Sequence, residues 1–378
     1  MPPFDSLCLV WRRLRHPVGL AVVVLLGWFL LDSILYRSGF YYRFLAEPHS
    51  NAGAAMLRPL LARRNATEVP PTVLVFGDSR VGQGFSPPTA ASVVSDVTFV
   101  NVAVPGSTAR TWYYLLRKMV RDEVPFDVVV VGVPYQPTGA ARWVDWSLDP
   151  AFMASLTDLR DAREFPASFE DPDIRRRARH AFWLPALQMQ QDTQALFASP
   201  RERWRSLRGK RWWLAHVDDY PGEDAHMPAA LEFDGNRQVR DWSRATAEQR
   251  AALEQHLQIL SQEPAADNEA FLGHWLGRLL GLVRGNGARL IIFPLPRGPY
   301  PEILPRDNVP SAALSALAQE PDVTLLPADF LADLEAPGYF FDALHANSTA
   351  RAIVSRRLAA AVAEVMAADG IRSDASQP

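Results

Sequence analysis

The chain has 378 residues, which is enough for one large domain or two of ordinary size. Its formal net charge of −3 gives no overall nucleic-acid-binding signature, and its single cysteine, Cys8, excludes an intrachain disulfide. Hydrophobic residues make up 48% of the chain, so a sizeable folded core is expected.

The N-terminal region predicts a membrane anchor. Arg12, Arg13 and Arg15 precede an apolar run over residues 17–31, which continues weakly to residue 36. About 20 residues suffice to cross a bilayer, and the positive flank is expected to stay in the cytoplasm. We therefore expect a single-pass protein of the bacterial inner (cytoplasmic) membrane, with the N-terminus cytoplasmic and the rest periplasmic. A cleaved signal peptide and a buried core helix are the alternatives, although no convincing small-residue cleavage site follows the run.

After a connector over residues 37–70, strands and helices alternate. The sequence predicts strands at "TVLVFG", "VTFVNVA" and "FDVVVVGVP", and helices at "SPPTAASVVS" and "STARTWYYLLRKMVRDEV", the latter capped by Ser107 or Thr108. The third strand is apolar on both faces, which is typical of a parallel sheet covered by helices. This alternation indicates right-handed crossovers within an α/β sandwich.

The alternation lapses over residues 136–262 and then resumes. Helices are predicted at "EAFLGHWLGRLLGLVRGNG", "SAALSALAQE" and "NSTARAIVSRRLAAAVAEVMAA", with strands at "ARLIIFPLP" and "DVTLLPA". We therefore expect a three-layer sandwich with a central parallel sheet of about five strands and a large, mostly helical insertion. The expected divisions are an anchor with a cytoplasmic tip (1–36), the connector (37–70), a domain in two segments (71–135 and 263–368), the insertion (136–262) and a disordered tail (369–378).

Polar residues follow the first predicted strand, where "GDS" ends at Ser79. In an open parallel sheet, functional groups gather at the carboxyl ends of the strands. Gly77 would allow a sharp turn, and the N-terminus of a following helix would favour developing negative charge near Ser79. A helix N-cap without chemistry is the alternative role for Ser79, and Asp78 is expected to be a structural turn residue.

A serine nucleophile needs a base and a group that orients that base. Asp342 and His345 lie three residues apart, just before the last predicted helix, so one turn can hold the carboxylate near the imidazole. His345 would take the serine proton while Asp342 fixes its tautomer. A surface or capping histidine is the alternative.

These residues resemble the SGNH, or GDSL-type, hydrolase superfamily. "FGDSR" looks like its first block, "DALH" like its final Asp-x-x-His block, and "NVAVPGST" is similar to its second block. The resemblance implies that Ser79 and Gly106 supply oxyanion donors through their backbone N–H groups. In the third block Gly132 matches, but Pro134 stands where the family has an asparagine that would be a further donor. Either Gln136 or another side chain replaces it, or the oxyanion hole has only the donors of Ser79 and Gly106.

The resemblance covers roughly residues 72–135 and 266–366, and it implies a flavodoxin-like sandwich. Membrane-anchored relatives of this design resemble the alginate O-acetylation proteins and the D-alanyl transfer protein of teichoic acid synthesis. The resemblance implies acyl transfer to a polysaccharide acceptor, with the acyl donor delivered by a multi-span membrane acyltransferase and with no cofactor. Two alternatives stay open: an esterase that uses water as the acceptor, and a non-catalytic scaffold of a polysaccharide assembly.

The insertion contains two basic, aromatic stretches, "RRRARHAFW" and "RERWRSLRGKRWW". They are either solvated amphipathic helices or a platform for a polymer or a membrane headgroup, in which Trp212 and Trp213 would stack on sugar faces. Arg80 is a further candidate for substrate binding. An extracytoplasmic location argues against nucleic acid. No metal site is expected, because several histidines lack metal-ligand spacing and are treated as structural: His49, His180, His216, His226, His256 and His274.

Overall fold

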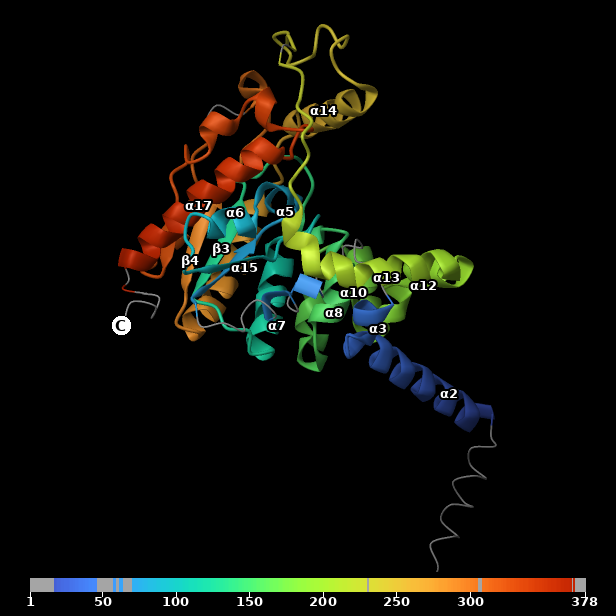
Figure 1. Cartoon of the computed structure of the whole chain (residues 1–378). Helices are drawn as coiled ribbons and strands as arrows, with labels where there is room; N and C mark the ends of the chain where they lie inside the picture. The colour runs from blue at the N-terminus through green and yellow to red at the C-terminus, as the bar shows by residue number, and fades with distance from the viewer. Residues whose placement is uncertain are drawn as a thin grey trace, which may run out of the picture.

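The computed structural model describes residues 17–45, 57–58, 61–63, 70–229, 231–304, 308–368 and 370. Its centre is a five-stranded parallel sheet with the order β2-β1-β3-β4-β5 (Figure 1). The strands are β1 (Thr72–Phe76), β2 (Thr98–Asn101), β3 (Val128–Val133), β4 (Arg289–Pro294) and β5 (Val323–Leu325). Each observed strand lies within an expected one, so the parallel α/β architecture is confirmed.

The strands pair in a register that brings their carboxyl ends to one edge. Val75 pairs with Asn101, and Phe76 with Val131. Every residue of β1 and β3 is buried, because helices cover both faces of the sheet. The continuous apolar runs of these strands follow from this double burial.

Helices form the two outer layers of the sandwich. α7 (Ala109–Arg121) and α15 (Asn268–Gly285) pack on one face, in a core cluster that contains Leu74 and Val129. α6 (Pro87–Ala91) and α17 (Ser348–Ala368) lie on the other face, where the cluster contains Val73. The expected three-layer sandwich is therefore confirmed.

The insertion between β3 and β4 is mostly helical (Figure 1). Its helices include α8 (Asp149–Leu156), α10 (Pro172–Trp183), α11 (Pro185–Gln188), α12 (Gln190–Ala198), α13 (Pro200–His216) and α14 (Ala247–Leu260). A short turn, η2 (Trp143–Asp145), precedes α8.

A buried ion pair joins the insertion to the sandwich. Arg110 of α7 donates to Asp149 at 2.9 Å, and both side chains are fully buried. Arg110 also donates to the backbone carbonyl of Val144 at 2.9 Å. The hydroxyl of Thr108 donates to Asp149 as well, which explains why Thr108 is the N-cap residue of α7 without capping it through its side chain. These contacts fix the residues that connect η2 to α8.

An apolar helix, α2 (Pro17–Asp32), projects away from the helices of the insertion (Figure 1). It continues into a π-helical turn, η1 (Ser33–Arg37), which contacts α8 and α11 of the insertion. Together they form the one helix among the described residues that is long and apolar enough to cross a membrane, and its apolar side chains are mostly exposed. This is consistent with a membrane anchor or a signal sequence. The arginines expected to flank it, Arg12, Arg13 and Arg15, lie outside the described residues, as does most of the expected tail.

Candidate functional site

Ser79 lies at the carboxyl edge of the sheet, just after β1. It is the first residue of α5 (Ser79–Gly84), a helix of six residues that follows Gly77 and Asp78. Gly77 does not have the positive φ that a sharp glycine turn would require. A Cβ on Gly77 would instead lie 2.2 Å from Cγ2 of Val81. Glycine is therefore needed for the close approach of α5 to the strand, and not for an unusual backbone conformation.

Asn101, at the end of β2, holds α5 in place. Its side-chain amide donates to the carbonyl of Phe85 at 3.0 Å, and its amide oxygen accepts from the backbone N–H of Ala103. The residue is buried, so these bonds are shielded from water. Asn101 thus links the second strand to the helix that carries Ser79.

The structure brings Ser79, His345 and Asp342 into one hydrogen-bonded row. Nε2 of His345 lies 2.8 Å from Oγ of Ser79, and Nδ1 lies 2.8 Å from Oδ2 of Asp342. The ring of Phe341 stacks on the imidazole, with 5.7 Å between centroids and 16° between planes. Because Nδ1 faces a carboxylate, the ring proton belongs on Nδ1, and the lone pair of Nε2 faces the serine hydroxyl. This is the geometry that a serine nucleophile and its base require.

Asp342 is oriented by its own loop. Its other oxygen, Oδ1, accepts the backbone N–H groups of Leu344 at 2.8 Å and of His345 at 2.7 Å. Burial alone would raise the pKa of Asp342, but the hydrogen bond and charge of His345, with the two backbone bonds, hold it below its ordinary value. The carboxylate is therefore ionised at neutral pH and stabilises a protonated His345.

Asp78 and Arg80 form a separate pair beside this row. Nε and Nη2 of Arg80 donate to the Asp78 carboxylate, at 2.7 Å for the shortest contact, and the carboxylate also accepts the backbone N–H of Arg80. Burial would raise the pKa of Asp78, but Arg80 holds it below its ordinary value. Asp78 is the N-cap of α5, which agrees with the structural role expected for it.

A cavity of about 150 Å³ opens beside Ser79, and we call it the serine cavity. Its polar lining comes from Asp78, Ser79, Arg80, Gly106, Ser107 and Thr108, and its apolar lining from Ala109, Trp112, Pro134, Trp143, Trp146 and Leu272. Trp143 and Trp146 belong to the insertion, which therefore walls the site. A cavity of this kind, apolar with a few convergent polar groups, is typical of small-molecule sites.

The tryptophans also brace the Gly106 loop. The indole N–H of Trp146 donates to the Gly106 carbonyl at 2.7 Å, and that of Trp112 donates to the Ser107 hydroxyl at 2.8 Å. Gly106 has φ of 68°, a conformation that favours glycine. In the described part of the chain, neither the Ser79 nor the Gly106 backbone N–H has a hydrogen-bond acceptor. Both are thus available to a ligand.

The structure does not bring Gln136 to the serine cavity. The Gln136 side-chain amide donates to the Val309 carbonyl at 2.8 Å, and the residue lines a different cavity. Pro134 does line the serine cavity, but it carries no donor. Gly132 is required by packing, since a Cβ there would lie 2.5 Å from Val81 and 2.7 Å from Phe293.

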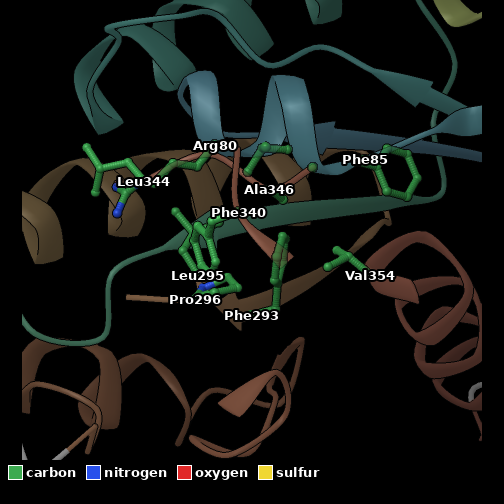
Figure 2. A pocket seen from close by; sticks show the side chains of 11 residues that line it. Arg80, Phe85, Phe293, Leu295, Pro296, Phe340, Leu344, Ala346 and Val354 are labelled. Atoms are coloured by element: carbon green, nitrogen blue, oxygen red, sulfur yellow. The ribbon is translucent and has the colours of Figure 1, made fainter. Parts of the chain in front are cut away.

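Arg80 lines the serine cavity and two others. One of these, of about 20 Å³, has otherwise apolar walls, with Arg80 and Leu344 at one end and Phe85 and Val354 at the other (Figure 2). Its size and lining fit a packing void. The other is the cavity that Gln136 lines. Arg80 therefore lies at the boundary between the serine cavity and its two neighbours, and its substrate-binding role stays a prediction.

Trp212 and Trp213, the expected stacking residues, belong to α13, but their side chains lie outside the part of the structure that is described. The sequence did not single out Trp143 and Trp146; the only signal was their place soon after the third predicted strand.

Within the described ranges, no group of three or more His, Cys, Asp or Glu side chains is placed to hold a metal ion.

Comparison with known proteins adds no assignment. No protein-family model matches the chain, and no curated protein is similar to it. The functional conclusion therefore rests on the geometry of the site.

Proposed function

We propose that this chain is an extracytoplasmic, membrane-anchored O-acyltransferase of SGNH type, which transfers a short, acetyl-like group to a cell-surface or secreted polysaccharide. The observation that carries the proposal is the hydrogen-bonded row of Ser79, His345 and Asp342 beside the serine cavity. The same order of nucleophile, base and orienting acid serves acyl transfer on unrelated folds. The residues that form it also carry the resemblance to the SGNH superfamily.

Acyl transfer proceeds in two halves. Oγ of Ser79 bonds to the acyl carbon of the donor while Nε2 of His345 takes the hydroxyl proton and passes it to the leaving group, whose bond to the acyl carbon breaks. A sugar hydroxyl then gives its proton to Nε2, its oxygen bonds to the acyl carbon, and Ser79 regains its proton as the acyl-enzyme bond breaks. The N–H groups of Ser79 and Gly106 stabilise the oxyanion in both halves.

The Asp342 carboxylate stabilises the imidazolium that forms in each half, because its pKa keeps it ionised at neutral pH. The serine cavity holds the acyl group, and its volume of about 150 Å³ favours a small one. The tryptophans of the insertion wall the serine cavity and reduce the access of water to the acyl-enzyme, which favours a sugar hydroxyl as the acceptor.

The proposed location is the outer face of the bacterial inner membrane, with α2 as the anchor. The base of this helix makes side-chain contacts with the insertion: Oδ1 of Asp32 accepts the backbone N–H of Ala186 at 2.9 Å, and the hydroxyls of Tyr36 and Thr193 lie 3.1 Å apart. If α2 and η1 were removed as a signal sequence, Ala186 and Thr193 would lose these partners, so the contacts favour an anchor that stays attached to the protein. A membrane-spanning acyltransferase would then deliver the donor at the membrane surface.

An esterase that uses water as the acceptor is the second candidate. It is favoured by the 23% exposure of the His345 side chain, which allows water to reach the base. The two candidates share the acyl-enzyme and differ in the molecule that accepts the acyl group.

The test is an acyl-transfer assay on the full chain in detergent, with an activated acetyl ester as donor and oligosaccharides of cellulose as acceptors. Mass spectrometry of the sugar should detect acetylated product with the wild type and none with Ser79→Ala. Efficient ester cleavage without any acetylated sugar would favour the esterase. Absence of both reactions would overturn the enzymatic proposal.

A further inference from the structure

His256 is a buried histidine whose two ring nitrogens make no hydrogen bond to the part of the chain that the structure describes. It lies on α14 of the insertion and is 5% exposed. Among the described residues, neither Nδ1 nor Nε2 has a hydrogen-bond partner. Buried polar atoms are paired in most proteins, so an imidazole with two unpaired nitrogens needs an explanation other than structural support.

The surroundings of His256 keep the imidazole neutral. Burial and the positive charge of Arg80 lower the pKa of His256 to about 4, although Asp342 acts weakly in the opposite direction. A neutral imidazole has one N–H donor and one acceptor nitrogen. A ligand that both donates and accepts, such as a hydroxyl group, matches this pair.

His256 lines a cavity of about 40 Å³, which we call the histidine cavity. Its walls include Arg80, Gln136, Thr138, Arg297 and Asn308, together with Pro134, Tyr135, Leu260, Leu295 and Leu344. The volume is a few times the roughly 10–15 Å³ that one water molecule needs. It therefore suits a single polar group, such as a hydroxymethyl, and not a whole sugar ring.

The polar side chains of this cavity use some of their donors in hydrogen bonds within the protein, and the other donors and acceptors remain for a ligand. The amide nitrogens of Gln136 and Asn308 donate to backbone carbonyls at 2.8 and 2.7 Å, which leaves each amide oxygen as the acceptor it can offer. Arg80 uses Nε and one N–H of Nη2 on Asp78, which leaves the N–H groups of Nη1 and the second N–H of Nη2 as donors. Both arginines of the cavity are paired with carboxylates, Arg80 with Asp78 and Arg297 with Glu335, so no unpaired charge favours a charged ligand over a neutral hydroxyl.

The backbone next to His256 is shaped to leave room for its ring. Gly298 has φ of 154°, and a Cβ there would lie 3.2 Å from Nε2 of His256 and 3.3 Å from Leu304. Glycine thus preserves the space at the ring nitrogen. The histidine cavity also adjoins the reacting residues, because Arg80 and Pro134 line both it and the serine cavity, and Leu344 precedes His345 in the chain.

We infer that the histidine cavity binds a hydroxymethyl group of the acceptor sugar, and that His256 is the residue that recognises it. The inference rests on the proposed function, since it assigns a subsite to the acceptor of that reaction. The reacting hydroxyl lies at Ser79, while the hydroxymethyl group occupies the other side of Arg80 and Pro134. His256 is accordingly a positioning residue that sets acceptor specificity.

The direct test uses the full chain with Ser79→Ala, so that no acylation occurs, and ¹⁵N-labelled histidine. Methyl glucoside and methyl galactoside are titrated against their 6-deoxy analogues while the ring ¹⁵N signals of His256 are followed. We expect the hexosides to shift these signals and the 6-deoxy sugars to bind at least tenfold more weakly. If the ring ¹⁵N signals of His256 respond neither to the hexosides nor to the 6-deoxy sugars, the inference is overturned.

A variant separates recognition from a structural role. His256→Leu should weaken hexoside binding at least tenfold by calorimetry, while its thermal midpoint stays equal to or above that of the wild type, because two unpaired buried polar atoms are removed. His226→Leu, at an exposed histidine, is the matched control and should bind as the wild type does. A lower thermal midpoint with unchanged sugar binding would assign His256 to structure and overturn the inference.

Labelling of Ser79 by a fluorophosphonate keeps the two proposals distinguishable. The reaction does not need the acceptor, so it reports on the nucleophile independently of sugar binding. If Ser79 is labelled in both the wild type and His256→Leu, but the hexosides bind these two proteins equally tightly, only the inference about the acceptor subsite fails. If Ser79 is labelled in neither, the proposed function itself fails.

Discussion

The indole N–H of Trp146 donates a hydrogen bond of 2.7 Å to the carbonyl oxygen of Gly106, which joins the insertion to the loop beside Ser79. Gly106 is held at φ of 68°, and its own N–H has no acceptor among the described residues. The insertion therefore helps to fix one of the two backbone donors that would stabilise an oxyanion. Preorganised donors of this kind supply a large share of the catalysis in acyl transfer.

Trp146→Phe should slow acylation of Ser79 by roughly tenfold, because a lost bracing bond is expected to cost less than the hundredfold or more of a lost oxyanion donor. The ring is retained, so the serine cavity should keep its shape. The measurement is the rate of single-turnover acylation by an activated acetyl ester. Trp204→Phe serves as the control, since Trp204 is 61% exposed on α13, and equal rates in the two variants would count against the bracing role.

Asp342→Asn should lower turnover of an activated ester by about a thousandfold or more. The amide can present its NH₂ group to Nδ1 of His345, which then carries its proton on Nε2 and cannot accept the one from Ser79. The fold should survive, because an amide oxygen can still accept the backbone N–H groups of Leu344 and His345. Turnover within tenfold of wild type would exclude Asp342 as the orienting group.

The same variant gives a pH-dependent stability difference. The pKa of Asp342 in the folded state lies below its ordinary value of 3.8, so its stabilising contribution is present above that value and is lost as pH falls through the folded-state pKa. We expect the difference in unfolding free energy between wild type and Asp342→Asn to shrink as pH falls below about 4. Urea unfolding at several pH values measures it. A difference that grows as pH falls below about 4 would contradict the assigned direction of the shift.

Gly77→Ala should destabilise the fold by about 1–3 kcal/mol, because a Cβ would lie 2.2 Å from Cγ2 of Val81. The displaced α5 should also carry Ser79 away from His345 and reduce activity. Gly281→Ala is the matched control: it lies exposed on α15 with no atom within 4 Å of the new Cβ, so it should stabilise by roughly 0.5–1 kcal/mol. If Gly77→Ala is as stable as Gly281→Ala, the packing explanation for Gly77 is wrong.

The sheet could be predicted because the information for it is local. Residues 128–133 form an uninterrupted apolar run, and such a run in a strand requires burial on both faces. Ser79, Asp342 and His345 could be proposed because each lies at a recognisable strand end or helix start. The separation of 266 positions between Ser79 and His345 does not obscure that pattern.

Contacts between irregular segments could not be predicted. Trp146 comes from a part of the chain without periodicity, so nothing in the sequence connects its indole to Gly106, 40 residues away. His256 was expected to be structural because its lack of partners is a property of the packed molecule. The sequence likewise predicts a sharp turn at Gly77. The actual requirement for glycine there is the close approach of Val81, which depends on how α5 lies against the sheet.

The central claim is that Ser79 is a nucleophile activated by His345, and fluorophosphonate labelling tests it most directly. The full chain is treated with the reagent, and the modified residue is located by peptide mass spectrometry. We predict one adduct on Ser79, no adduct at that position in Ser79→Ala, and labelling of Ser79 slowed at least a hundredfold in His345→Ala. An unlabelled Ser79, or labelling that proceeds equally well in His345→Ala, would contradict the account.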